Sequence, residues 1–241
     1  MSTQIQESIR CACGSLVSDD MVELARMFPK IIFANQCDAC ASREAQDESR
    51  RKELIERQRE QSEREARLDM IPPEMLRTRI NHPSFNPGLW MRVEGWQPSG
   101  LKWLGIVGGA GECKTRCMAL LAKRLILAGH RLMWTTAVEF QDRVDETLRG
   151  DRGEVKEATK YFQRCKSTGI LILDDFGKNT WNPTVERHMF SVIDHRKTHD
   201  LPVLWTSNTS PLEILATAGL SKDRGAPLIG RILEASTIEK A

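Results

Sequence analysis

The sequence predicts an α/β fold in which a parallel β-sheet is flanked by helices. From about Lys102 onward, short and almost continuously apolar runs alternate with segments of helical period. The four apolar runs are KWLGIVG, RLMWTT, GILILDD and PVLWTSN. Such runs are typical of strands buried on both faces, and their alternation with helices is typical of a helix-covered sheet. A glycine-rich loop after the first run and two cysteine pairs near the N-terminus predict where the functional sites lie.

Composition divides the 241 residues into three expected parts. We expect a cysteine-bearing module at 1–42, a solvated linker helix at 43–70 and the α/β domain at 71–241. The linker is almost entirely charged or Gln, with opposite charges at helical spacing, and its adjacent Leu54 and Ile55 are too few for a coiled-coil seam. Prolines at 72, 73, 83 and 87 break helices and indicate the start of the α/β domain.

Charge and hydropathy narrow the classes of partner. The 35 basic and 33 acidic side chains nearly cancel, so any DNA contact must come from a local patch. The sequence has no stretch of about 18 apolar residues and no apolar run at its N-terminus, so we expect a cytoplasmic protein without a membrane partner. In that reducing compartment the seven cysteines are not expected to form disulfides.

Four of those cysteines have the spacing of metal ligands. Cys11 and Cys13 form a C-x-C pair, and Cys37 and Cys40 form a C-x-x-C pair. Two such pairs supply four thiolates for a tetrahedral structural Zn²⁺, and so small a module has too little core to fold without one. The alternative is four reduced thiols in a poorly ordered segment.

The glycine-rich loop GIVGGAGECKTR, Gly105–Arg116, lies between an apolar strand and a helix that starts near Lys114. Such a loop exposes backbone N–H groups to phosphate at the positive end of a helix. Lys114 is placed for the β- and γ-phosphates of ATP, and Thr115 for Mg²⁺. The predicted phosphate-binding residues are Gly108, Gly109, Ala110, Gly111, Glu112, Cys113, Lys114, Thr115 and Arg116.

One position of the loop departs from the usual pattern, because Cys113 stands where a glycine normally precedes the lysine. A side chain at a position that favours positive φ costs about 1 to 2 kcal/mol and crowds the phosphate path, which weakens binding. Taken alone, the loop could also be a glycine-rich turn without function.

Polar residues at the ends of two later strands support the nucleotide site. Asp174 and Asp175 end LILDD, where one carboxylate holds Mg²⁺ and its neighbour orients the attacking water. Asn208 follows the next strand, at the edge where ligands bind in open α/β sheets. Thr206 and Ser207 could instead simply cap the turn into Pro211. Together with the loop, these residues predict ATP binding and hydrolysis.

These motifs carry a family resemblance. GGAGECKTR, LILDDFGK, ERHMFSVIDHR, TSN and GAPLIGRILEAS, spread over roughly 71–238, resemble the AAA+ helicase loaders of the DnaC type, together with IstB-type transposition ATPases and many phage loaders. Phage members also carry Cys before the lysine. The resemblance implies an AAA+ P-loop core, a replicative helicase partner docked through the N-terminal module, single-stranded DNA binding, and homo-oligomers in the ATP-bound form.

The resemblance also implies residue roles. Lys114 and Thr115 look like the Walker A pair, Asp174 the Mg²⁺ acid and Asn208 the first sensor. Asp175 occupies the catalytic-base position, where Glu is common, which implies slow hydrolysis. Arg231 matches the arginine finger that completes a neighbouring subunit's site, and Arg224 is a weaker candidate for that role.

Three alternatives remain open. Residues 135–166 mix Phe140, Tyr161 and Phe162 with basic side chains, which suits stacking on single-stranded DNA, but an ordinary amphipathic helix pair fits equally. The chain could be an IstB-like transposition helper, although those relatives generally lack a cysteine module. It could also be a zinc-dependent adaptor whose nucleotide site is degenerate and structural, as Cys113 and Asp175 suggest.

Overall fold

The computed structural model describes residues 11, 13, 15–20, 23, 27, 37–83, 85–98 and 102–241. The chain forms two compact units, Met1–Ser62 and Glu63–Ala241. In the first unit, Cys11, Val17 and Cys37 are buried together, and Cys40 packs against them. No helix among the described residues is long and apolar enough to cross a membrane.

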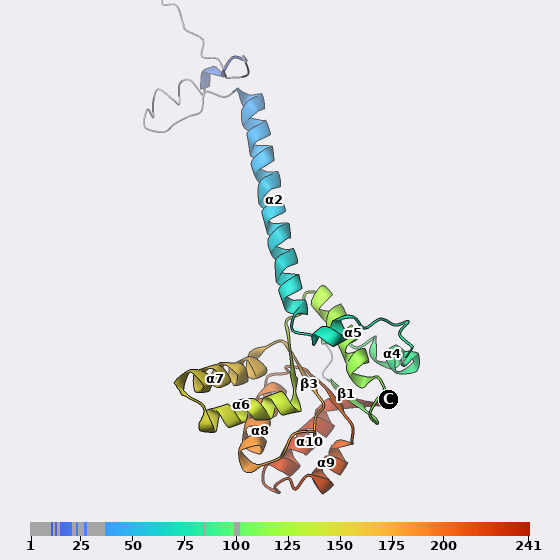
Figure 1. The fold of residues 1–241 in the computed structure, drawn as a ribbon. Helices are drawn as coiled ribbons and strands as arrows, with labels where there is room; N and C mark the ends of the chain where they lie inside the picture. The colour runs from blue at the N-terminus through green and yellow to red at the C-terminus, as the bar shows by residue number, and fades with distance from the viewer. Residues whose placement is uncertain are drawn as a thin grey trace, which may run out of the picture. The chain divides into compact units, whose positions relative to one another are not determined.

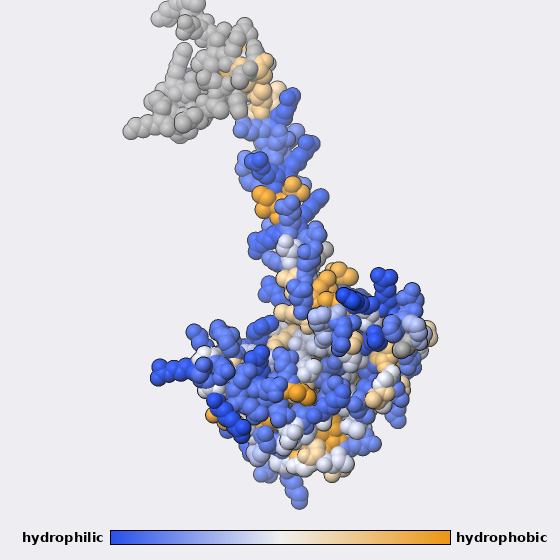
Figure 2. All heavy atoms as spheres, viewed as in Figure 1, coloured by the Kyte–Doolittle hydropathy of each residue, from blue (hydrophilic) through white to orange (hydrophobic). Residues whose placement is uncertain are grey.

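The charged linker helix is present as α2, Asp38–Leu68 (Figure 1). Opposite charges pair along its surface, as in Lys52 with Glu48 at 2.8 Å. Each exposed pair of this kind contributes less than about 1 kcal/mol, so the helix depends on many of them and on helix-forming residues. Leu54 and Ile55 are exposed, and hydrophilic side chains cover most of the face of this helix seen in Figure 2. The helix begins earlier than residue 43, so Cys40 lies in its first turn.

The second unit contains a five-stranded, entirely parallel sheet in the order β2-β3-β4-β1-β5. Its strands are β1 Trp103–Val107, β2 Leu132–Thr136, β3 Ile170–Asp174, β4 Val203–Ser207 and β5 Ser236–Lys240. The four predicted apolar runs form β1 to β4, so the predicted α/β fold is confirmed. The fifth strand, STIEK, is polar and lies at one edge, where β1 is its one partner strand among the described residues.

Helices cover both faces of the sheet (Figure 1). They are α3 Pro73–Leu76, α4 Pro87–Val93, α5 Lys114–Leu127, α6 Ala137–Arg149, α7 Arg152–Ser167, α8 Pro183–Thr198, α9 Pro211–Thr217 and α10 Gly225–Ala235. Side chains of β3 alternate between two cores, as strand geometry requires. Ile170 and Ile172 pack with α4 and α5, whereas Leu171 and Leu173 pack with α6, α7, α8 and α10.

Three tryptophans of the strands are buried in the core. Trp103, Trp134 and Trp205 are each at most 8% exposed. The Trp205 ring passes over Gly105, where a Cβ atom would lie 2.2 Å from the ring. Its Nε1 donates to the hydroxyl of Ser236 at 2.9 Å. Gly105 therefore allows a β4 side chain to cross β1 and reach the edge strand β5.

The edge strand is also fastened by an arginine of α4. Arg92 donates through Nε to the Glu239 carboxylate at 3.1 Å and through Nη2 to the carbonyl of Lys240. The backbone N–H of Ala241 donates to the carbonyl of Val107 at 2.9 Å. These contacts fix β5 beside β1, at the point where β1 leads into the glycine-rich loop.

The aromatic residues of the α6 and α7 region do not form a surface for stacking bases. Phe140, Tyr161 and Phe162 are buried and pack edge to face on one another, with centroid distances from 5.1 to 6.2 Å. The stacking interpretation of residues 135–166 is therefore wrong. The apolar faces of an amphipathic helix pair account for the pattern instead.

Candidate functional site

The glycine-rich loop connects the end of β1 to the first turn of α5. Gly111 and Cys113 both have positive φ, at 82° and 69°. Cys113 is the residue that caps α5, in the left-handed conformation, and its side chain makes no capping hydrogen bond. The positive φ expected at Cys113 is therefore found, and the thiol-bearing residue carries strain of about 1 kcal/mol that glycine would not.

Two side chains of the loop bind its own backbone. The Gly109 N–H donates to the Glu112 carboxylate at 2.5 Å, and the Lys114 ammonium donates to the Gly109 carbonyl at 2.6 Å. Burial lowers the pKa of Lys114, and the nearby Asp175 carboxylate partly opposes that shift. A partly desolvated ammonium at a helix N-terminus gains from an anionic partner such as phosphate.

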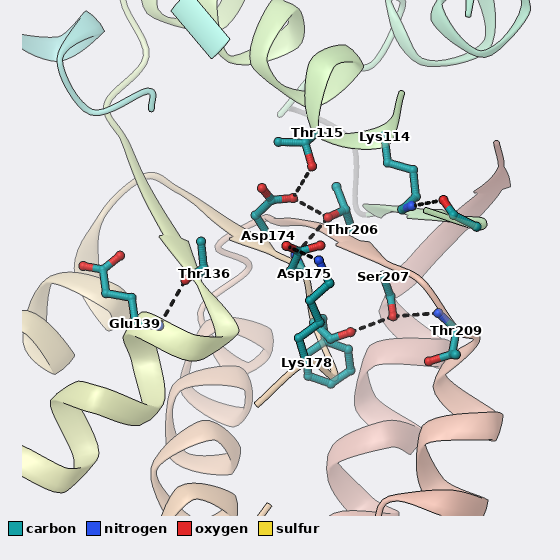
Figure 3. A network of polar contacts seen from close by, with 12 residues as sticks. Lys114, Thr115, Thr136, Glu139, Asp174, Asp175, Lys178, Thr206, Ser207 and Thr209 are labelled. Carbon is teal, nitrogen blue, oxygen red and sulfur yellow. Dashed lines mark hydrogen bonds and ion pairs between the residues drawn. The ribbon is translucent and has the colours of Figure 1, made fainter. Parts of the chain in front are cut away.

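Asp174, the last residue of β3, is buried beside the first turn of α5 (Figure 3). Its Oδ1 accepts hydrogen bonds from the Thr115 hydroxyl, at 3.1 Å, and from the Thr206 hydroxyl. Burial raises the pKa of Asp174, although these two hydroxyls partly counter the rise. A buried carboxylate next to a threonine hydroxyl is an oxygen donor set that Mg²⁺ prefers.

Asp175 follows with φ of 58°, a conformation uncommon for a residue with a side chain. Its N–H donates to the Thr206 hydroxyl at 3.0 Å, and its carboxylate pairs with Lys178 at 2.8 Å. Thr206 therefore holds both acids in place, and interpreting Thr206 as a turn cap is wrong. Ser207 does accept from the Thr209 N–H, but α9 is capped by Ser210.

A cavity of about 670 Å³ lies over this edge of the sheet. It brings together many of the predicted site residues: Ala110, Gly111, Glu112, Cys113, Lys114, Thr115, Arg116, Asp174, Asp175 and Asn208. Its volume is within the range of small-molecule sites. Gly108 and Gly109 lie just outside its lining, where the Glu112 carboxylate approaches both of them.

The sequence interpretation missed several residues of this cavity. Pro72, Glu74 and Met75 contribute from the proline-rich lead-in, Thr136 from the end of β2, and Lys178 from the loop after β3. Of these residues, only Thr136 could have been identified from the sequence, because it too stands at the end of an apolar run. In the structure Thr136 caps α6, since its hydroxyl accepts from the Glu139 N–H at 3.0 Å (Figure 3).

The two candidate arginine fingers lie elsewhere. Arg231 lies within α10, where its Nε donates to Asp194 at 2.7 Å. Arg224 precedes the first turn of α10. Among the described residues, neither arginine is part of the lining of the cavity at the sheet edge.

The four predicted zinc ligands lie together. The sulfur atoms of Cys11, Cys13, Cys37 and Cys40 are all within 4.8 Å of one another. Hydrogen bonds from Ser15 lower the pKa of Cys13 to about 6, whereas contacts with the other thiols raise that of Cys40 to about 12. So close a group cannot carry several negative charges without a cation, and four sulfurs are a donor set that Zn²⁺ prefers. The cluster thus suggests a zinc module.

We expect the purified protein to contain about one zinc ion per chain, and Cys37→Ser to lose most of it, because three thiolates bind Zn²⁺ more weakly than four. Elemental analysis after dialysis measures this directly. Cys113→Ser is the control, since it removes a thiol that lies outside the cluster. Equal zinc in the two variants would contradict the assignment of the ligands.

Comparison with known proteins finds similarity to proteins of DNA replication. No family model matches it. Over 114 residues, 47% of the chain, it is 29% identical to the replicative helicase loader DnaI of Bacillus subtilis. That segment covers 35% of the relative, so the chain matches about a third of that protein's length.

Solved structures share the fold of the second unit's sheet and helices. A DnaI structure matches with a TM-score of 0.54 and 20% identity, covering 70% of this chain and 90% of that one. The DnaC helicase loader gives 0.51 and 18%, covering 70% and 99%. A DnaA replication initiator bound to AMPPCP and single-stranded DNA gives 0.54 and 17%, covering 70% and 50%. The predicted resemblance to AAA+ helicase loaders is therefore confirmed.

Proposed function

From the AAA+ fold and the likeness to helicase loaders, we propose that this protein hydrolyses ATP slowly as a loader of a replicative helicase in the cytoplasm. The observation that carries the proposal is the cavity in which Lys114, Thr115, Asp174, Asp175 and Asn208 meet. These residues come from three different segments of the chain, and each supplies a group that phosphoryl transfer requires.

The first part of the proposed mechanism is binding. The Lys114 ammonium leaves the Gly109 carbonyl and pairs with the β- and γ-phosphates, while backbone N–H groups at the start of α5 receive phosphate oxygens. Glu112 must release the Gly109 N–H for the same purpose, because a carboxylate and a phosphate repel each other. Thr115 and Asp174 would hold Mg²⁺, which when bound neutralises charge on the phosphates.

The second part is hydrolysis. Asp175 accepts a proton from water as the water oxygen bonds to the γ-phosphorus, and the bond from that phosphorus to the bridging oxygen breaks, so that ADP leaves with the electron pair. Lys178 is ion-paired with Asp175 at 2.8 Å and so competes with water for this carboxylate, which fits slow turnover. We propose that Asn208 orients the γ-phosphate and that Arg231 of a second copy stabilises the transition-state charge.

The proposed partners follow from similarity. The DnaI relative is a replicative helicase loader, and the DnaA structure holds single-stranded DNA. We propose that the four-cysteine module docks on the helicase, that the AAA+ unit contacts single-stranded DNA, and that ATP promotes homo-oligomers. The cysteine module also argues against an IstB-like transposition helper.

A second candidate is a zinc-dependent adaptor with a degenerate nucleotide site. Three observations favour it: Cys113 has a strained φ, Lys114 is bonded to the Gly109 carbonyl, and Asp175 is ion-paired with Lys178. If the chain is such an adaptor, the glycine-rich loop serves only to connect β1 to α5.

Steady-state ATP turnover, with and without single-stranded DNA, separates the two candidates. We expect turnover that DNA stimulates and that Lys114→Ala reduces by about 100-fold or more, because the ammonium stabilises charge that develops in the transition state. Lys102→Ala is the matched control, since Lys102 is exposed just before β1 and outside the cavity. Absent turnover and absent ATP binding in a zinc-loaded sample would instead support the adaptor.

A further inference from the structure

The Arg231 guanidinium is held from several sides within its own chain. Its Nε donates to Oδ1 of Asp194 on α8 at 2.7 Å. Its central carbon lies 4.4 Å from the centre of the Phe190 ring, and Nη1 donates to the Pro227 carbonyl at 3.4 Å. Among the described residues no acceptor bonds to Nη2. The guanidinium is thus fixed through Nε, Nη1 and the face that lies over Phe190, whereas Nη2 keeps its donors for another ligand.

This arrangement lies at the surface, where another molecule can reach it. Arg231 and Asp194 line an open cavity of about 580 Å³ formed by α8 and α10, and their side chains are 30% and 43% exposed. The cavity is separate from the nucleotide cavity of the same chain, with which it shares no lining residue. Nη2 is therefore accessible to a ligand from outside the chain.

We propose that Asp194 is a positioning residue that presents Arg231 to the nucleotide of a second copy of this chain. The inference rests on the proposed function, in which Arg231 completes a neighbouring site. A free arginine side chain samples many rotamers, and this freedom must be lost before its donors can align with phosphate oxygens. Asp194 and Phe190 fix the conformation of Arg231 before the reaction, so the side chain does not have to become ordered as the transition state forms.

The competing explanation is that the Arg231–Asp194 pair only joins α8 to α10. The structure offers a matched control for it. Lys197 and Glu234 form a second ion pair between the same two helices at 2.5 Å, about one helical turn further along, and line the same cavity. A purely structural role predicts equal effects from breaking either pair, whereas positioning predicts an effect only at Asp194.

The first experiment measures kcat and KM for Asp194→Ala, Asp194→Asn and Lys197→Ala, with melting temperatures to confirm folding. We expect Asp194→Ala to lower kcat about 10-fold or more with KM nearly unchanged, because a misplaced donor weakens only the transition state. Asp194→Asn should be intermediate, since its amide oxygen still accepts from Nε. Lys197→Ala should behave as wild type.

The second experiment mixes variants to establish which chain Asp194 serves. Lys114→Ala chains mixed with Asp194→Ala chains should exceed the summed turnover of the separate samples, because each Lys114→Ala chain brings an intact Asp194–Arg231 pair to its neighbour's intact site. Asp194→Ala mixed with Arg231→Ala should show no such gain.

The outcomes distinguish the positioning role of Asp194 from the neighbouring-site function of Arg231 on which that role rests. Equal kcat for Asp194→Ala and Lys197→Ala, in a protein that Arg231→Ala impairs, overturns the positioning role alone. Wild-type protein without turnover, or Arg231→Ala with full turnover, overturns the neighbouring-site function and the inference with it.

Discussion

Asp174→Asn should abolish magnesium-dependent ATP turnover and at the same time stabilise the nucleotide-free protein. The substitution removes the anionic oxygen that would hold Mg²⁺, and losing several kcal/mol of transition-state stabilisation corresponds to a fall of about 100-fold or more. It also removes a buried charge, because Asp174 is only 4% exposed and burial raises its pKa.

The pH dependence follows from the direction of that pKa shift. A carboxyl group whose pKa is raised by folding favours the folded state while it is protonated, and this contribution is lost as the pH rises through the folded-state pKa. The melting temperature of Asp174→Asn should therefore exceed that of wild type by a few degrees, about 2 to 4 °C per kcal/mol, near neutral pH, and the difference should shrink in acid.

Melting curves across this pH range and turnover assays on the same samples measure both effects. Asp142→Asn serves as the control, because it neutralises an exposed carboxylate of α6 and should change neither property. A variant that retains turnover would contradict the metal-binding role of Asp174. A variant that melts below wild type at neutral pH would contradict the destabilising effect of its buried charge.

Arg196→Leu should destabilise the second unit by about 4 kcal/mol or more, enough to unfold many domains. Arg196 is completely buried, and burial lowers its pKa to about 10, so the guanidinium remains charged at neutral pH. Its Nη1 and Nη2 donate to the backbone carbonyls of Cys165, Lys166, Thr168, Gly169 and Pro202. Its Nε is buried and has no partner among the described residues.

Those carbonyls explain the size of the effect. Cys165 and Lys166 lie in the last turn of α7, where carbonyls lack helical partners and a cation is favoured. Pro202 immediately precedes β4. Leucine would remove all of these donors, at about 1 to 3 kcal/mol for each carbonyl that stays buried and is not resolvated. The Pro202 carbonyl would keep the Leu171 N–H, which donates to it at 3.2 Å.

Chemical denaturation of Arg196→Leu, Arg196→Lys and Arg187→Leu measures the contribution. Lysine retains the charge and up to three donors, so it should lose less stability and stay folded for measurement. Arg187 is exposed on the same helix, and its replacement should change stability by no more than about 0.5 kcal/mol. Similar stabilities for the two leucine variants would show that the buried arginine contributes nothing specific.

The sequence predicted the fold wherever a local pattern determines the structure. Strands β1 to β4 are apolar because they are buried on both faces, so their runs stand out. Strand β5 has no such run, since it is an edge strand specified by its pairing with β1 and by the Trp205–Ser236 hydrogen bond. Contacts between distant segments leave no local signal.

The same distinction holds for the site. Lys114, Thr115 and Asp174 follow from spacing along the chain, because loop, helix and strand place them in sequence order. The role of Thr206 depends on β4 lying beside β3, which brings its hydroxyl to both acids. Met75 reaches the cavity only because the lead-in packs against α5, where Lys123 bonds to the carbonyls of Leu76 and Thr78.

The polar strand β5 also bears on how the protein behaves at high concentration. An unpaired edge of a sheet can recruit a strand from another molecule, which leads to aggregation. Here the strand is short and polar, it carries Glu239 and Lys240, and Arg92 already occupies the Lys240 carbonyl. Strand β5, which contributes little to the hydrophobic core, thereby disfavours edge-to-edge association at this edge of the sheet.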